Sequence, residues 1–213
     1  MNVALTTPGP TRERLLAAGR EIMLKEGFQG LTVRQVAASA DANLGSFVYH
    51  FGTRDAFIQA LLEEWYAPLL SRVTGVAEDV GTPLERLRRS VLQLIDFAAE
   101  NDAFMGRVLM GAAAGEKVAR RFLASLAQRH PRVLLSLIAA AQTDGAIVDE
   151  HPAQVLCFLM ASVGLPRLIA SAWHGPALFK GSIGSTMSRI ARDRNYIVQR
   201  LDWAILGLTP QGS

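Results

Sequence analysis

The chain has 213 residues, half of them apolar and 19% charged, so it can bury a sizeable core and lacks the composition of a disordered polymer. Its net charge of +3 permits nucleic-acid binding without requiring it, because the first 60 residues carry six Lys/Arg against five Asp/Glu. The single cysteine, Cys157, excludes an intrachain disulfide and favours a reducing compartment, so we expect a cytoplasmic protein.

Residues 1–10 are expected to form a short disordered arm, with no secretory leader. The first helix of interest begins at Thr32, whose hydroxyl can cap it while Gln35 reaches back to complete a capping box. Its apolar face contains Val33, Val36, Ala37 and Ala40, which follow the helical period. A turn is expected at Asp41-Ala42-Asn43, because Asp and Asn tolerate left-handed backbone angles.

A second short helix follows this turn. Leu44, Phe47, Val48 and Phe51 recur at helical spacing and are expected to form its buried face. The open face is then left to Asn43, Gly45, Ser46, Tyr49 and His50. Gly52 is expected to end the helix, and Thr53 to cap the next one. Two short helices joined by a tight turn suit insertion into the major groove of DNA.

These residues carry a family resemblance. The segment Thr11 to Leu62 resembles the N-terminal DNA-binding domain of TetR-family transcriptional regulators. The matching pattern runs through the basic entry at residues 11–14, Glu26-Gly27-Phe28, residues 32–37 and residues 49–55. The resemblance implies an all-helical homodimer that binds a palindromic double-stranded DNA operator, usually as a repressor, and carries a variable ligand-binding domain.

The resemblance also implies roles for individual residues. Arg34 matches a position that can reach a base edge, and Asn43, Gly45 and Ser46 match the leading turn of the recognition helix. Tyr49, His50 and Arg54 match phosphate-contacting positions, and Thr32 is expected to add a backbone contact from its helix start.

Three residues depart from the family's pattern. Asp41 replaces the usual glycine of the turn, and Val48 replaces a frequent tyrosine and cannot hydrogen-bond a phosphate. Leu44 lies on the apolar face by spacing, whereas the family often turns this position to the groove. The sequence does not decide whether Leu44 faces the core or the DNA, and we include it among the candidate DNA-binding residues.

The rest of the chain also has helical periodicity. Helices are expected at residues 54–76, from Thr82-Pro83 onward, and at about 103–113, 116–142, 152–173 and 185–208. Pro131 and Pro166 should each break or kink a helix, and residues 174–184 should form a loop. The most apolar stretch, residues 155–173, contains Pro166 and Arg167, and its uncharged part is too short to span a bilayer.

The last two helices are the candidate dimer interface, because similar proteins pack the corresponding pair against their symmetry mates. Its candidate residues are Val155, Phe158, Met187, Ile190, Ile197, Leu201 and Ala204. Tyr196 and Trp203 would add large contact areas. An apolar stripe of this kind also fits packing within the subunit's own core.

Large apolar and flexible side chains on several helices are candidates for the lining of an effector pocket, with plain core packing as the alternative. They are Trp65, Phe97, Phe104, Met105, Met110, Phe122 and Met160. Few charges lie on the apolar faces, so a small hydrophobic or aromatic molecule is the preferred effector. The four histidines, at positions 50, 130, 151 and 174, lack metal-type spacing, and we expect no metal, cofactor or enzymatic activity.

The sequence therefore predicts an all-α protein in three parts. Residues 1–10 form the arm, 11–56 a three-helix helix-turn-helix domain, and 57–213 a helical ligand-binding and dimerisation domain. The predicted function is a cytoplasmic, ligand-responsive transcriptional regulator without a membrane partner. Two alternatives stay open: an architectural DNA binder without ligand control, and an apolar-ligand binding module or small helical enzyme with no DNA role.

Overall fold

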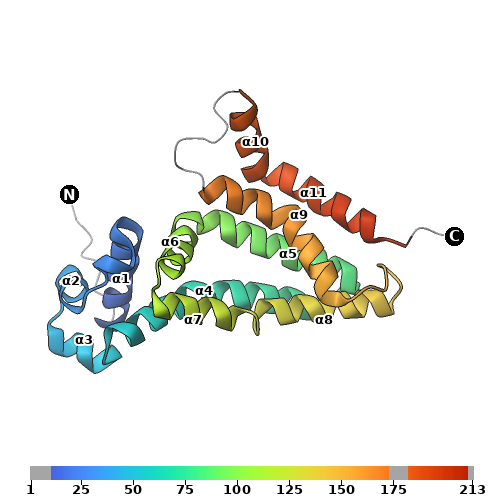
Figure 1. Cartoon of the computed structure of the whole chain (residues 1–213). Helices are drawn as coiled ribbons and strands as arrows, with labels where there is room; N and C mark the ends of the chain where they lie inside the picture. Colours follow the sequence, from blue (N-terminus) through green and yellow to red (C-terminus); the bar gives the residue numbers. More distant parts are fainter. Residues whose placement is uncertain (1–10, 173–181, 211–213) are drawn as a thin grey trace, which may run out of the picture. The chain divides into compact units, whose positions relative to one another are not determined.

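The computed structural model describes residues 11–172 and 182–210, so the arm expected at residues 1–10 lies outside the described residues. Every regular element within these two ranges is a helix, as the sequence predicts (Figure 1). The chain forms two compact units. Unit 1 holds the chain up to Ala67 together with Ala103–Ala124, and unit 2 holds Pro68–Asp102 together with the chain from Ser125 onward. This division differs from the boundary expected at residues 56 and 57.

The helices of unit 1 come from two separate stretches of sequence. They are α1 (Thr11–Glu26), the 3-10 helix η1 (Gly27–Gly30), α2 (Val33–Ser39), α3 (Leu44–Phe51), α6 (Asp102–Ala113) and α7 (Lys117–Leu126). The long helix α4 (Arg54–Glu78) begins in unit 1 and ends in unit 2. The other helices of unit 2 are α5 (Pro83–Glu100), α8 (His130–Thr143), α9 (Pro152–Ala172), α10 (Ser182–Arg192) and α11 (Arg194–Leu208).

The start and stop signals read from the sequence around α2 and α3 are confirmed. The Thr32 hydroxyl accepts a hydrogen bond from the Gln35 amide, and Asp41 adopts a positive φ of 48° in the turn. Gly52, with a φ of 70°, ends α3, and the Thr53 hydroxyl accepts from the amide of Ala56. The expected capping box is only half formed, because the Gln35 side chain donates to the Glu26 carboxylate.

An aromatic contact anchors α3 to α4 in unit 1. The ring of Phe47 is buried and lies 5.1 Å from the ring of Phe57, and Phe51 lies 5.0 Å from Phe57. Helix α1 approaches the same ring so closely that a Cβ on Gly19 would collide with Phe57. Any larger residue at position 19 would force the buried Phe57 ring to shift, and α1, α3 and α4 share one core.

A second aromatic cluster joins α4 to α6 and α7 within unit 1. The ring of Trp65 lies 5.0 Å from Phe104 and 6.3 Å from Phe122, and Tyr66 meets Phe122 edge-on at 5.9 Å. All four side chains are buried. The packing explains why residues 103–124 belong to the same unit as the helices at the start of the chain.

Unit 2 is a helical bundle in which α8 packs against α5 and α9, and α9 packs against α10 and α11 (Figure 1). Its core includes Leu87 and Val91 of α5, Leu159 of α9 and Leu201 of α11. Arginines that the sequence pattern places on the outer side of α5 make ion pairs, such as Arg88 with Asp202 at 2.7 Å.

Two expected helices are each split in the structure. Residues 116–142 form α7 and α8, with Pro131 in the first turn of α8, so the predicted break at this proline is confirmed. Residues 185–208 belong to α10 and α11, because the carboxylate of Asp193 caps a new helix by accepting from the Asn195 amide. Helix α9 runs through Pro166, so this proline does not end it.

The loop expected at residues 174–184 falls mostly outside the described residues, and α10 already begins at Ser182. Among the described helices, none combines the length and apolar character needed to cross a lipid bilayer. Within the same ranges, no group of three or more His, Cys, Asp or Glu side chains is arranged to hold a metal ion.

Candidate nucleic-acid interface

The helix pair α2 and α3 has its apolar side fixed by the core of unit 1. Val36, Ala37 and Ala40 are buried on α2, and Phe47 is buried on α3. Asn43 starts α3 by accepting a 2.7 Å hydrogen bond from the Ser46 amide through its side-chain oxygen. Local capping and burial of one face together determine which side chains of each short helix point outward.

Leu44 and Val48 lie on the exposed face of α3. Leu44 is 47% exposed and Val48 is 56% exposed. The expectation that Val48 belongs to the buried face is therefore wrong, and the open question about Leu44 is answered in favour of solvent. Phe47 and Phe51 alone anchor the helix, so the buried stripe is narrower than the spacing suggests.

The remaining candidates for DNA contact gather on the same helix pair. Arg34 is exposed on α2, and Asn43 and Gly45 are exposed at the start of α3. Ser46 is half-buried, and Thr32 is exposed with its hydroxyl used as the cap of α2. The structure thus brings these candidates to one helix-turn-helix segment.

Tyr49 and His50 lie together near the end of α3. Tyr49 is 85% exposed, and its ring meets the half-buried His50 ring edge-on at 5.0 Å. The guanidinium of Arg12 stands 5.7 Å from the ring centroid of Phe51, the next residue. Arg12 is absent from the candidates drawn from the sequence, because only the tertiary fold places the start of α1 beside the end of α3.

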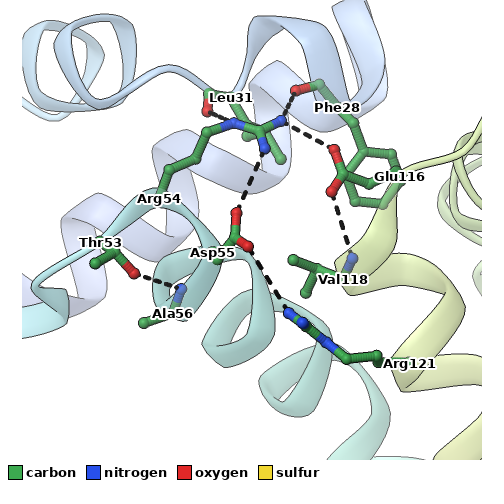
Figure 2. Close-up of polar contacts among 9 residues, drawn as sticks. All are labelled: Phe28, Leu31, Thr53, Arg54, Asp55, Ala56, Glu116, Val118 and Arg121. Atoms are coloured by element: carbon green, nitrogen blue, oxygen red, sulfur yellow. Dashed lines mark hydrogen bonds and ion pairs between the residues drawn. The ribbon is translucent and has the colours of Figure 1, made fainter.

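The side chain of Arg54 is not free to bind a phosphate, contrary to what the sequence led us to expect. Figure 2 shows its guanidinium turned toward the segment that precedes α2. The Nε atom donates to the carbonyl of Leu31 at 2.9 Å, and one terminal nitrogen donates to the carbonyl of Phe28 at 2.7 Å. The planar fork of arginine suits this geometry, since it can donate to two acceptors at once.

A carboxylate at the start of α7 completes the surroundings of Arg54. Glu116 accepts from the same terminal nitrogen of Arg54 at 3.2 Å, and its other oxygen accepts from the amide of Val118 (Figure 2). Asp55 lies 3.8 Å from Arg54 and 3.8 Å from Arg121. The charge of Arg54 is therefore balanced within the protein, and its donors face backbone carbonyls rather than the exposed face of α3.

A second arginine ties α6 to the end of α1. Arg107 donates to the carbonyl of Leu24 at 2.9 Å and to the carbonyl of Lys25 at 3.0 Å. Carbonyls in the last turn of a helix lack intrahelical donors, so a guanidinium satisfies them well. Arg107 of α6 thus holds the end of α1, and Arg54 of α4 holds Phe28 within η1 and Leu31 after it.

The candidates for dimer contact divide between the core and the surface of unit 2. Val155, Ile197, Leu201 and Ala204 are buried in the subunit's own core, so the alternative of internal packing holds for these four. Phe158 and Met187 are exposed, and Ile190 is half-buried. Trp203 (61% exposed) and Leu206 lie on the outer face of α11.

The candidates for an effector pocket do not form one cluster. Trp65, Phe104 and Phe122 share the aromatic cluster of unit 1, whereas Phe97 and Met160 belong to unit 2, where Met160 packs against the core. Met105 is half-buried in unit 1. Met110 is exposed on α6, so it does not line an interior space.

Comparison with known protein families gives a match at the same segment. The sequence profile described as "Bacterial regulatory proteins, tetR family" matches residues 15–61, which contain α2 and α3. The chain is 26% identical over 155 residues to the HTH-type transcriptional repressor DhaR of Mycobacterium sp. (strain GP1), an alignment that spans 72% of this chain and 78% of DhaR. It is 36% identical over 72 residues to the HTH-type transcriptional repressor NemR of Escherichia coli (strain K12), over 34% of this chain and 36% of NemR.

Solved structures with the same fold extend the likeness to nearly the whole chain. The TetR family transcriptional regulator PfmR from Thermus thermophilus aligns with a TM-score of 0.62 at 18% identity, over 89% of this chain and 97% of that protein. The ketosteroid transcriptional regulator KstR2 of Mycobacterium tuberculosis aligns with a TM-score of 0.61 at 18% identity, over 96% and 98%. At these identities the likeness concerns the fold alone.

Proposed function

The chain belongs to the TetR family of bacterial regulatory proteins, and we propose that it is a repressor that binds a palindromic operator as a homodimer and releases it when a small effector binds. The observation that carries this proposal is the face formed by Arg34, Leu44, Gly45 and Tyr49, which is exposed on a helix pair whose other side is buried. A homodimer presents two such faces, and these would read two half-sites in successive major grooves.

Within this face, hydrogen-bonding groups take different roles. Arg34 is the candidate for a specific base contact, since its fork can donate to both O6 and N7 of guanine. Tyr49 and His50 are candidates for phosphate contact, and Arg12 joins them because it lies beside the end of α3. Contacts to phosphate set the register of the protein on DNA, whereas contacts to base edges specify the sequence.

We assign Arg54 a positioning role instead of a phosphate contact. Its hydrogen bonds to Phe28 and Leu31 hold the segment that leads into α2 against the start of α4. Glu116 neutralises the buried side of the guanidinium. A phosphate contact needs a cation whose donors can reach the DNA and displace its condensed counterions, and the donors of Arg54 are already engaged by two backbone carbonyls and Glu116.

The proposed dimer surface lies on the outer faces of α9 and α11, two helices that pack against each other. It comprises the exposed side chains of Phe158, Leu165, Trp203 and Leu206. Large exposed aromatic and aliphatic residues grouped on neighbouring helices are typical of a protein-protein interface. The interface therefore uses the side of α11 opposite to Ile197 and Leu201.

The proposed effector is a small hydrophobic or aromatic molecule, as expected from the sequence. The aromatic cluster of Trp65, Phe104 and Phe122 supports this class, since aromatic side chains suit an apolar ligand. An effector can lower operator affinity only through its preference for the conformation that does not bind DNA, a coupling of about 1–3 kcal/mol.

The central test of this function is selection of bound duplexes from a random DNA pool. We expect a palindromic sequence to be enriched, and we expect footprinting to show protection of that short site. Its affinity should fall when an apolar effector from a ligand panel is added. Uniform coating of DNA would instead favour the architectural binder, and no binding at low ionic strength would favour the ligand module without a DNA role.

Arg34→Ala and Tyr49→Ala should weaken operator binding in different ways. In Arg34→Ala, each subunit of the homodimer loses one bidentate base contact, which should cost about 1–3 kcal/mol per half-site and relax the preference at one base pair there. Tyr49→Ala should weaken binding to operator and random duplex by a similar factor. Titrations of both duplexes at one salt concentration measure this, and equal sequence preference in wild type and Arg34→Ala would contradict the assignment.

Arg54→Lys separates a positioning role from a phosphate contact. Lysine keeps the positive charge but cannot donate to two carbonyls and Glu116 in the same plane, so operator affinity and thermal stability should both fall. In Arg54→Gln, which removes the charge, the slope of log K against log salt should stay at the wild-type value, whereas loss of one phosphate contact from each subunit of the dimer would change it by about 1.8. Two results together would contradict the positioning role and support a phosphate contact. They are an operator affinity near the wild-type value in Arg54→Lys and a reduced salt slope in Arg54→Gln.

Leu201→Ala and Trp203→Ser form a matched pair on opposite faces of α11. Leu201 is fully buried, so its truncation should reduce the free energy of unfolding by about 2–5 kcal/mol. Trp203→Ser should leave a folded protein that sediments as a monomer at concentrations where the wild type is a dimer. Urea denaturation and sedimentation velocity distinguish the two effects. A dimeric Trp203→Ser variant would remove this surface from the interface.

A further inference from the structure

Leu44 and Val48 form an apolar pair on the exposed face of the recognition helix. They stand four residues apart, so they are neighbours on one side of α3, across its first and second turns. Leu44 is 47% exposed and Val48 is 56% exposed, although the helix has only eight residues and already buries Phe47 on its other side. The core of unit 1 therefore leaves both side chains on the surface that is proposed to contact the operator.

The backbone between them is open to close approach. A Cβ placed on Gly45 would meet only the side-chain oxygen of Asn43, at 3.2 Å. That oxygen is already the acceptor for the Ser46 amide. Leu44, Gly45 and Val48 have no hydrogen-bonding side-chain group. The centre of the exposed face of α3 can therefore offer a partner only shape and apolar contact.

Only one base offers an apolar group in the major groove. Thymine projects its 5-methyl group there, whereas the edges of adenine, guanine and cytosine present hydrogen-bond donors and acceptors. Placing Leu44 or Val48 against those polar edges would remove water from them without a replacement hydrogen bond, which is unfavourable. A thymine methyl is the chemically matched contact.

We propose that Leu44 and Val48 form a thymine-methyl reading surface, so that each operator half-site contains thymine at the positions these two side chains reach. This inference rests on the proposed function and adds the chemistry of the bases. Arg34 on α2 supplies the polar part of the readout and the Leu44–Val48 pair the apolar part. The two surfaces together predict a half-site that combines guanine with one or more thymines.

The experiment replaces single thymines of the selected operator with deoxyuridine, which lacks only the 5-methyl group. Each substitution is made symmetrically in both half-sites, and affinity is measured by fluorescence anisotropy at constant salt. Burying one methyl group contributes roughly 0.8 kcal/mol, so loss of two should weaken wild-type binding by about 15-fold at a position that is read. Thymines outside the readout serve as internal controls.

Protein variants assign each methyl group to its side chain. Leu44→Ala and Val48→Ala should bind the thymine operator more weakly and lose the discrimination between thymine and uracil at their own position. Val48→Thr keeps the shape but places a hydroxyl near the methyl, and should lose part of that discrimination. Val80→Ala, at an exposed position after α4, is the matched control and should discriminate as the wild type does. Circular dichroism checks that every variant is helical.

Two results would overturn the proposal. Wild-type protein that binds every deoxyuridine operator as tightly as the thymine operator would show that no methyl group is read. Equal weakening of thymine and uracil operators by Leu44→Ala and Val48→Ala would place the pair against sugar and phosphate. Failure of the random pool to yield any operator would overturn the proposed function as well, so the two failures are distinguishable.

Discussion

The burial of Phe47 against Phe57 is the contact on which the exposed face of α3, the proposed DNA-contacting surface, depends. An isolated helix of eight residues is not stable in water, because so few hydrogen bonds do not offset the cost of nucleation. Helix α3 exists because Phe47 is held in the core shared by α1, α3 and α4. Rotation of the helix about its axis would remove that ring from its site, so one buried side chain determines which residues face outward.

The local features of this region were predictable because they depend on neighbouring residues. Thr32, Thr53 and Gly52 occupy the caps expected of them, and Asp41 adopts the left-handed backbone expected in the turn. The buried face of α3 was predicted only in part. Leu44 and Val48 follow the helical period as well as Phe47 does, and periodicity is ambiguous when a short helix is apolar on two sides. Contacts with distant residues decide between the two sides.

The environments of Arg54 and α11 also could not be predicted from the sequence, because they depend on residues far away in the chain. A cation at the start of a helix beside a recognition segment is typical of a phosphate ligand, but Glu116, which lies 62 residues away in the sequence, gives it an internal partner. Helix α11 has apolar residues on two faces, and the sequence cannot tell which one meets the core. The structure places Leu201 inside and Trp203 outside, so the stripe chosen for the dimer is the stripe that holds the subunit together.

The proposed DNA-contacting face combines Arg34 with the aliphatic side chains of Leu44 and Val48. This combination determines how sequence preference should respond to salt. Phosphate contacts release counterions, so the affinity they provide falls steeply as salt rises. Burial of a methyl group involves no charge, so its contribution, roughly 0.8 kcal/mol for each group, is not screened. Affinity for all DNA should therefore decline with salt while the preference for thymine over uracil stays constant. Under the proposed readout, Val48 in place of the tyrosine frequent in the family would shift the balance from overall affinity toward sequence preference.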